Sequence, residues 1–199
     1  LTQPDVNRMQ AKRCPNVFVA IAFGLTSLGL VAPVAAAPVT VEYPSTACPD
    51  TGDEGLQQCI DSVDSGSTVI LTTEIIDEPA VIDKSLTLRA VDRALRPVLL
   101  GVSIAAPIGG ETAKVVVQDI RFSLTLFVNL STGSGHSVII RRVEVGKGAL
   151  EPPGMRLASS VPASITLEHS FIRSDQEDQL DVLNLVADDP DGRVYFRIV

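Results

Sequence analysis

The sequence predicts an all-β repeat fold, in which short strands stack as successive layers of a solenoid. Three observations support this prediction. A strand-like motif recurs every 23–29 residues, Val, Ile and Leu supply much of the apolar content, and aromatic residues make up only 4% of the 199 residues. β-branched residues favour strands, and repeats of this period belong to units that bury their apolar face only by stacking on neighbours.

The motif has the pattern x-apolar-x-apolar-polar and occurs five times. Such alternation places both apolar positions on one face of a strand, and parallel neighbours lie about 4.8 Å apart, so like residues should stack in columns. Three copies continue with a second apolar pair, with one residue slipped in the fourth. The copies are Ser85–Arg93, Lys114–Phe122, Ser137–Val145, Ser164–Ile172 and Arg193–Val199. The second positions are Leu86, Val115, Val138, Ile165 and Val194, and the fourth are Leu88, Val117, Ile140, Leu167 and Phe196.

One helix is expected, at Glu54–Asp64. Asp53 can cap its first turn, and Gly66 can end it. So short a helix is marginal alone, and we expect it to pack against an apolar surface. Its apolar face, at helical spacing, comprises Leu56, Cys59, Ile60 and Val63.

The N-terminal segment is typical of export. Residues 1–8 precede Met9 and are interpreted as upstream translation, and residues 9–37 as a signal peptide. Basic Lys12 and Arg13 are followed by the uncharged stretch Val17–Val34 and by small residues, with cleavage expected after Ala36. The alternative is a retained anchor, because 18 uncharged residues are near the lower limit for a membrane span. After cleavage of the signal peptide, residues 38–199 would form a secreted or cell-envelope domain without a membrane span.

Cysteine number and charge agree with export. Cys48 and Cys59 remain after cleavage, and an even count in an exported chain predicts one disulfide. The alternative is that both are reduced, with Cys59 filling the apolar face of the helix. The net charge of −8 does not suggest nucleic acid or an anionic membrane as a partner.

Three segments resemble the right-handed parallel β-helix of the pectate-lyase-like superfamily. Residues 55–72 resemble its N-terminal helix and first strand, Val81–Arg89 its next turn, and Val115–Phe122 its internal coil. The resemblance covers about residues 48–174 and implies that the helix plugs one end of the coil. The lyase and polygalacturonase motifs of that superfamily are absent, and the chain has no Trp. No catalytic residue can therefore be assigned.

The last copy stops at Val199 without a second strand or a cap. Repeat rods need a capping element at each end. We therefore interpret residues 38–199 as the N-terminal part of a longer β-helix. The alternative is a short rod that a partner chain closes.

Polar columns are expected outside the coil, at the fifth, sixth and eighth positions of the motif. They could bind an acidic sugar polymer, with Arg141, Arg142 and His169 as ligand or proton-transfer groups. The alternative is structural, because opposite charges on adjacent strands stabilise the register. The candidates are Arg89, Gln118, Asp119, Arg121, Arg141, Arg142, Glu144, Glu168 and His169. Asp92 would share the eighth position with Arg121 and Glu144.

Two more outer features carry predictions. The sixth position lacks the Asn ladder of many similar β-helices, which predicts an irregular turn. The third position forms an apolar stripe, either covered by Leu124–Leu130 and Leu150–Pro162 or open to a partner. Its members are Thr87, Val116, Ile139, Thr166 and Tyr195.

Late acidic clusters at 175–181 and 188–191 are oxygen-rich enough for calcium. Asp188–Gly192 lacks the spacing of a helix-flanked calcium loop, however, and its Asp, Pro and Gly are typical of a turn. We assign no metal and no cofactor.

These observations predict a secreted or cell-envelope β-helix, a non-catalytic surface, adhesive or polysaccharide-binding module that contacts polysaccharide or envelope glycan. The alternative is a polysaccharide lyase or glycoside hydrolase whose catalytic residues lie beyond Val199. Whether the protein is an enzyme stays open, because both functions rest on analogy with a fold that hosts many activities.

Overall fold

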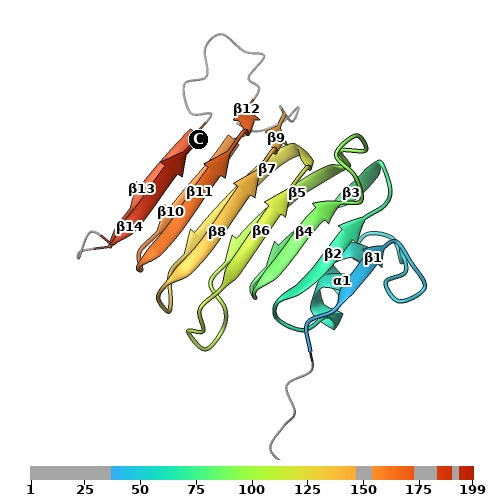
Figure 1. Cartoon of the computed structure of the whole chain (residues 1–199), viewed down its shortest axis with the longest axis horizontal. Coiled ribbons are helices and arrows are strands. Elements are labelled where there is room, and N and C mark those ends of the chain that lie inside the picture. Colours follow the sequence, from blue (N-terminus) through green and yellow to red (C-terminus); the bar gives the residue numbers. More distant parts are fainter. Residues whose placement is uncertain (1–36, 147–153, 173–182, 190–192) are drawn as a thin grey trace, which may run out of the picture. The chain divides into compact units, whose positions relative to one another are not determined.

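The computed structural model describes residues 37–146, 154–172, 183–189 and 193–199, all within one compact unit, Ala36–Val199. These residues form parallel sheets that coil as a β-solenoid of about five turns, with a single short helix (Figure 1). The predicted all-β repeat fold is confirmed. Residues 1–36, which hold the predicted upstream segment and all but the last residue of the predicted signal peptide, lie outside the described residues. Within the described ranges, no helix is long and apolar enough to span a bilayer.

Sheet A forms one wall of the solenoid, and its strands lie side by side in chain order (Figure 1). Each strand comes from a successive coil and pairs in parallel with the next. The strands are β1 (Thr40–Tyr43), β2 (Ser67–Leu71), β4 (Leu86–Ala90), β6 (Lys114–Gln118), β8 (His136–Arg141), β11 (Ala163–Glu168) and β14 (Val194–Ile198).

Sheet B forms the remaining walls and bends within each coil. On one side, β7 pairs with β9 at Arg121–Phe122 and with β10 at Thr125–Leu130. On its other side, β7 pairs with β5, and the register of that pair shifts between Leu99 and Gly101. Each coil therefore turns a corner inside sheet B. The strands are β3 (Ile75–Ile82), β5 (Val98–Ala105), β7 (Arg121–Leu130), β9 (Glu144–Val145), β10 (Gly154–Ser159), β12 (Phe171–Ile172) and β13 (Leu183–Ala187).

The apolar columns predicted from the motif form the core. Leu86, Val115, Val138 and Ile165 align in register, and all are almost fully buried. Full burial of such a side chain stabilises the fold by about 1.5–3 kcal/mol. One such column therefore contributes substantially to the stability of the stacked coils, none of which could fold alone.

The last two copies depart from the prediction. In β14, Phe196 aligns with Ile165 and Val194 with Ala163, so the predicted register of the fifth copy is wrong by two residues. A two-residue shift keeps every side chain on its face, which is why the pattern could not detect it. In the fourth copy the expected slip is absent, because Ile172 aligns with Val145.

Helix α1 (Gly55–Ser62) is shorter than the predicted Glu54–Asp64. Glu54 occupies the N-cap position without a side-chain capping bond, so the prediction of Asp53 as the cap is wrong. Instead, the Leu56 N–H donates to Glu78 Oε1 at 2.8 Å. A carboxylate from β3 thus satisfies a helix-end donor that a local cap would otherwise bind.

The apolar face of α1 closes the first coil, as expected. Leu56, Cys59 and Ile60 are buried in the core. The Gln57 amide bonds both backbone groups of Val81, at 2.7 and 3.3 Å, and so occupies the edge of β3. The predicted disulfide joins Cys48 to Cys59, with the two Cα atoms 5.0 Å apart.

Candidate functional site

The fifth-position residues form a real column on the outer face of sheet A. Arg89, Gln118, Arg141 and Glu168 align in register, and Arg141 Nε donates to Glu168 Oε2 at 2.6 Å. Arg89 donates to the Ala90 carbonyl and forms no ion pair within the described ranges. The polar columns at the fifth, sixth and eighth positions, which together form the ladder, are thus held partly by ion pairs between layers.

The sixth-position turn is regular, contrary to the prediction. Asp119, Arg142 and His169 all adopt left-handed backbone angles, with φ of 59°, 51° and 48°. Their N–H groups each donate to a carbonyl of the next layer, at 2.8–3.1 Å. After glycine, Asn and Asp tolerate this conformation best. Three layers therefore share the same left-handed turn, although none of them carries asparagine at this position.

Asp119 and Arg142 form an ion pair of the ladder that has two hydrogen bonds. Arg142 Nε and Nη2 donate to the two Asp119 oxygens at 2.6 and 2.7 Å, and Gln118 also donates to Asp119. Hydrogen bonds from Arg142 hold the pKa of Asp119 below its ordinary value, against the opposing effect of burial. Asp119 is therefore an engaged carboxylate rather than a base available for proton transfer.

The eighth-position column differs from the prediction at Asp92. Arg121 Nε donates to buried Glu144 at 3.1 Å, and Arg96 lies 4.0 Å from the same carboxylate. Asp92 instead accepts the N–H groups of Ala94 and Leu95 in its own turn. Asp92 is not part of the column, because Val98 of β5 is the residue that pairs with Arg121.

Among the described residues, the His169 ring has no partner that would orient it for proton transfer. The residue is exposed at its turn, and its ring has no hydrogen-bond partner in the part of the chain that the structure describes. A general base is normally oriented by a second group. Together with the engaged Arg141 and Arg142, this favours the structural interpretation of the ladder.

The third-position stripe lies on the outer face of sheet A, where Thr87, Val116, Ile139 and Thr166 align and are half-buried. The segments expected to cover it contain β7 and β10, which are strands of sheet B, so that prediction is wrong. Tyr195 aligns with Ser164 beside the stripe, and its side chain is 66% exposed.

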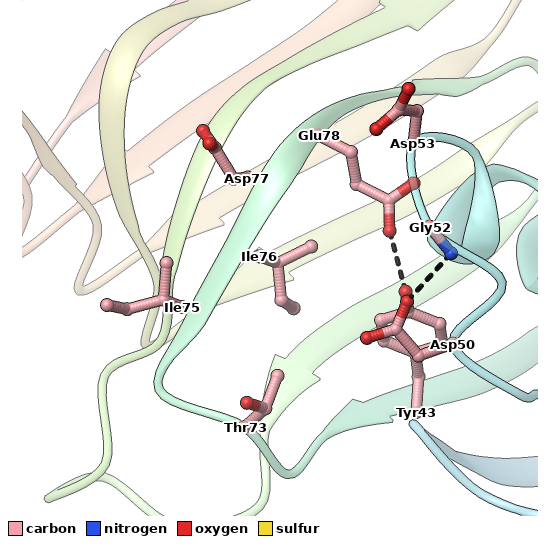
Figure 2. A pocket seen from close by; sticks show the side chains of 9 residues that line it. All are labelled: Tyr43, Asp50, Gly52, Asp53, Thr73, Ile75, Ile76, Asp77 and Glu78. Carbon is pink, nitrogen blue, oxygen red and sulfur yellow. Dashed lines mark hydrogen bonds between the residues drawn. The ribbon is translucent and has the colours of Figure 1, made fainter.

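A pocket that the motif did not predict lies between the start of β3 and the segment before α1 (Figure 2). Its volume is about 320 Å³, and four carboxylates line it, from Asp50, Asp53, Asp77 and Glu78. Glu78 lies in the inward series Ile76, Glu78, Ala80, Ile82 of β3. A charged residue at an inward strand position was the available signal, because charged groups are almost never buried without a partner.

Glu78 joins three elements. Its Oε1 accepts the Tyr43 hydroxyl at 2.6 Å and the Leu56 N–H at 2.8 Å. Burial, and then the bond to Glu78, raises the pKa of Tyr43 above its usual range, so this hydroxyl remains a donor at neutral pH. Glu78 Oε2 is buried without a hydrogen-bond partner among the described residues.

No group of three His, Cys, Asp or Glu side chains among the described residues is placed to hold a metal ion. Most of the late acidic clusters predicted as calcium candidates lie outside those residues. Asp189, which is described, accepts the Arg193 N–H in a turn.

Comparison of the chain with protein-family models, with curated proteins and with solved structures found no match. The parallel β-solenoid is therefore assigned from its strand pairing alone.

Proposed function

We propose that this chain is a non-catalytic, secreted or cell-envelope module that binds acidic polysaccharide on the outer face of sheet A. The observation that carries the proposal is the exposed Tyr195 ring beside a row of outward polar side chains. A tyrosine ring has an apolar body and a polar tip, which suits the mixed apolar and hydroxyl faces of a sugar. The outward neighbours are Lys114, Ser137 and Ser164 in one column and Arg89, Gln118 and Arg141 in another.

Charge on this face supports an acidic polymer. Arg89, Lys114 and Arg197 point outward from sheet A, and none is in an ion pair within the described ranges. Of the three ladder carboxylates, Asp119 and Glu168 accept hydrogen bonds from arginine beside sheet A, and Glu144 lies in β9 of sheet B. Glu42 of β1 is an exposed acid in the same outward column as Arg89. Within the described ranges, three cations without an ion pair therefore share this wall with one such carboxylate, although the whole chain is acidic.

The same pairing argues against hydrolysis on this wall. A glycoside hydrolase needs two carboxyl groups that face each other across the sugar. Glu168, the remaining ladder carboxylate, accepts a 2.6 Å hydrogen bond from Arg141. The disulfide supports an oxidising compartment outside the cytoplasm.

Affinity electrophoresis in gels that contain polygalacturonate, alginate or a neutral glucan tests the proposal. We expect retardation in one of the acidic gels, weakened about tenfold by Tyr195→Ala and several-fold by Arg89→Ser. Arg156→Ser is the matched control, because Arg156 is exposed on sheet B, where it lies over the Phe127 ring. Equal retardation of all variants would overturn the proposal, and release of unsaturated or reducing ends would favour the enzyme alternative.

A further inference from the structure

We propose that the acidic pocket beside α1 binds an ammonium group carried on a short apolar stem. The pocket lies at the first coil, between β3 and the segment that the disulfide anchors (Figure 2). It is a second binding site, and it does not depend on the function proposed for sheet A.

Uncompensated charge is the first argument. Asp50, Asp53, Asp77 and Glu78 line the pocket, and none of the described residues that line it is basic. None of the four carboxylates forms an ion pair within the described ranges. The ladder carboxylates Asp119, Glu144 and Glu168, in contrast, each have an arginine partner. A concave site lined by one sign of charge concentrates ions of the opposite sign.

The unpartnered oxygen of Glu78 is the second and independent argument. Glu78 is only 4% exposed, and its Oε1 already accepts two hydrogen bonds. Its Oε2 accepts none from the described residues, although Glu78 lines the cavity. A buried acceptor left unsatisfied is costly, more so when it is charged. A ligand with N–H donors would remove that cost.

The size and lining of the pocket favour an organic cation over a metal ion. Its volume of about 320 Å³ is that of a small-ligand site. Calcium requires six to eight oxygens at about 2.3–2.6 Å, and no three acidic side chains among the described residues are placed to share an ion. Ile76 and the 71% exposed Ile75 also line the pocket. They offer an apolar contact for a stem, and an ammonium brings three donors.

The walls of the pocket are held in place before a ligand binds. The Cys48–Cys59 disulfide anchors both ends of the segment, and the Gly52 N–H donates to Asp50 Oδ1 at 3.1 Å. Gly55 approaches Tyr43 so closely that an added Cβ would lie 2.7 Å from the Tyr43 hydroxyl. A site that is already ordered loses less binding free energy to the ordering of its side chains and loops when a ligand binds.

Isothermal titration calorimetry with pentylammonium tests the proposal. We expect saturable one-to-one binding, with pentanol and ammonium chloride at least tenfold weaker, because each lacks one half of the recognised group. Asp53→Asn and Asp77→Asn should each weaken binding several-fold, whereas Asp64→Asn, an exposed acid outside the pocket, should not. The three substitutions are isosteric, and circular dichroism checks the fold of each variant.

Any one of several results would overturn the proposal. They are no binding of pentylammonium, equal binding of pentanol, and pentylammonium binding that both pocket variants retain. Tight binding of calcium chloride that displaces pentylammonium would also overturn it, in favour of a metal site. Glucosamine and Nα-acetyl-lysine amide carry the same ammonium, and their relative affinities distinguish an amino sugar from a lysine side chain as its source.

Discussion

The Tyr43 hydroxyl donates a 2.6 Å hydrogen bond to Glu78 Oε1, across the interior of the first coil. Tyr43 ends β1 of sheet A, whereas Glu78 lies in β3 of sheet B, and both side chains are buried. The Leu56 N–H of α1 bonds the same oxygen. One carboxylate thus ties together both sheets and the helix at the N-terminal end of the solenoid.

Tyr43→Phe should destabilise the fold by about 1.5–3 kcal/mol, the range for hydrogen bonds to charged groups. The variant removes a donor from a buried carboxylate and adds no new contact. Urea denaturation measures the change in the free energy of unfolding. Tyr195→Phe is the matched control, and at this exposed site the change should stay within about 0.5 kcal/mol. Equal effects of the two substitutions would contradict the role of Glu78.

Ionisation of Tyr43 should require strongly alkaline solution. Its pKa in the folded protein is raised above the ordinary 10.0, so the folded state holds this proton more tightly than the unfolded chain does. The resulting stabilisation is fully present below pH 10 and is lost as the pH rises through the folded pKa. Absorbance titration near 295 nm of Tyr195→Phe isolates Tyr43, because the chain has two tyrosines. A midpoint near pH 10 in the folded state would contradict the prediction.

The Asp119–Arg142 pair should lose its stabilising effect in acid. The folded pKa of Asp119 lies below its ordinary 3.8, so its contribution is present above about pH 4 and is lost as the pH falls through the folded pKa. Asp119→Asn should therefore be less stable than the parent chain at pH 6, and this gap in the free energy of unfolding should narrow at pH 3. Urea denaturation at both pH values measures the gap. A gap independent of pH would show that the carboxylate charge is unimportant.

Reduction of the Cys48–Cys59 disulfide should lower stability by about 3 kcal/mol, the loop-entropy value for a closed loop of this length. Thermal unfolding with and without dithiothreitol measures the loss. A Cys48→Ser, Cys59→Ser double variant separates the bond from other effects of the reductant, and it should not respond to dithiothreitol. Equal melting of the oxidised and reduced chains would show that the segment before α1 is held by Glu78 and Gln57 instead.

Much of the wall architecture was predictable because it depends on local periodicity. Alternation in the five copies identified Leu86, Val115, Val138 and Ile165 as one buried column, and the outward column from Arg89 to Glu168 followed from the same register. The register of β14 was not predictable, since Val194, Phe196 and Ile198 alternate equally well in either alignment. Only contact with β11 selects one of them.

The pocket was not predictable, because its residues have no common local pattern. Asp50 and Asp53 precede the helix, whereas Asp77 and Glu78 lie more than twenty residues later, and a disulfide and a bent strand bring them together. The Asp119–Arg142 pair, in contrast, joins the same position of two copies, so the repeat itself indicated that they would meet. Apart from the disulfide, sequence reasoning therefore found contacts between equivalent positions of the repeat and missed contacts between unlike segments.

By itself, the sequence determined the all-β solenoid, the inward columns and the disulfide pair, because the spacing of apolar residues and the number of cysteines do not depend on tertiary contacts. The tertiary structure alone decided how deeply each charge is buried and that the pocket carboxylates form no ion pair within the described ranges. It places arginine beside Asp119, Glu144 and Glu168, and it buries the carboxylate of Glu78 with one oxygen that accepts no hydrogen bond from the described residues. The physical reason is that the effect of a charge depends on its distance to other charges and on its burial, and both arise only when distant segments pack.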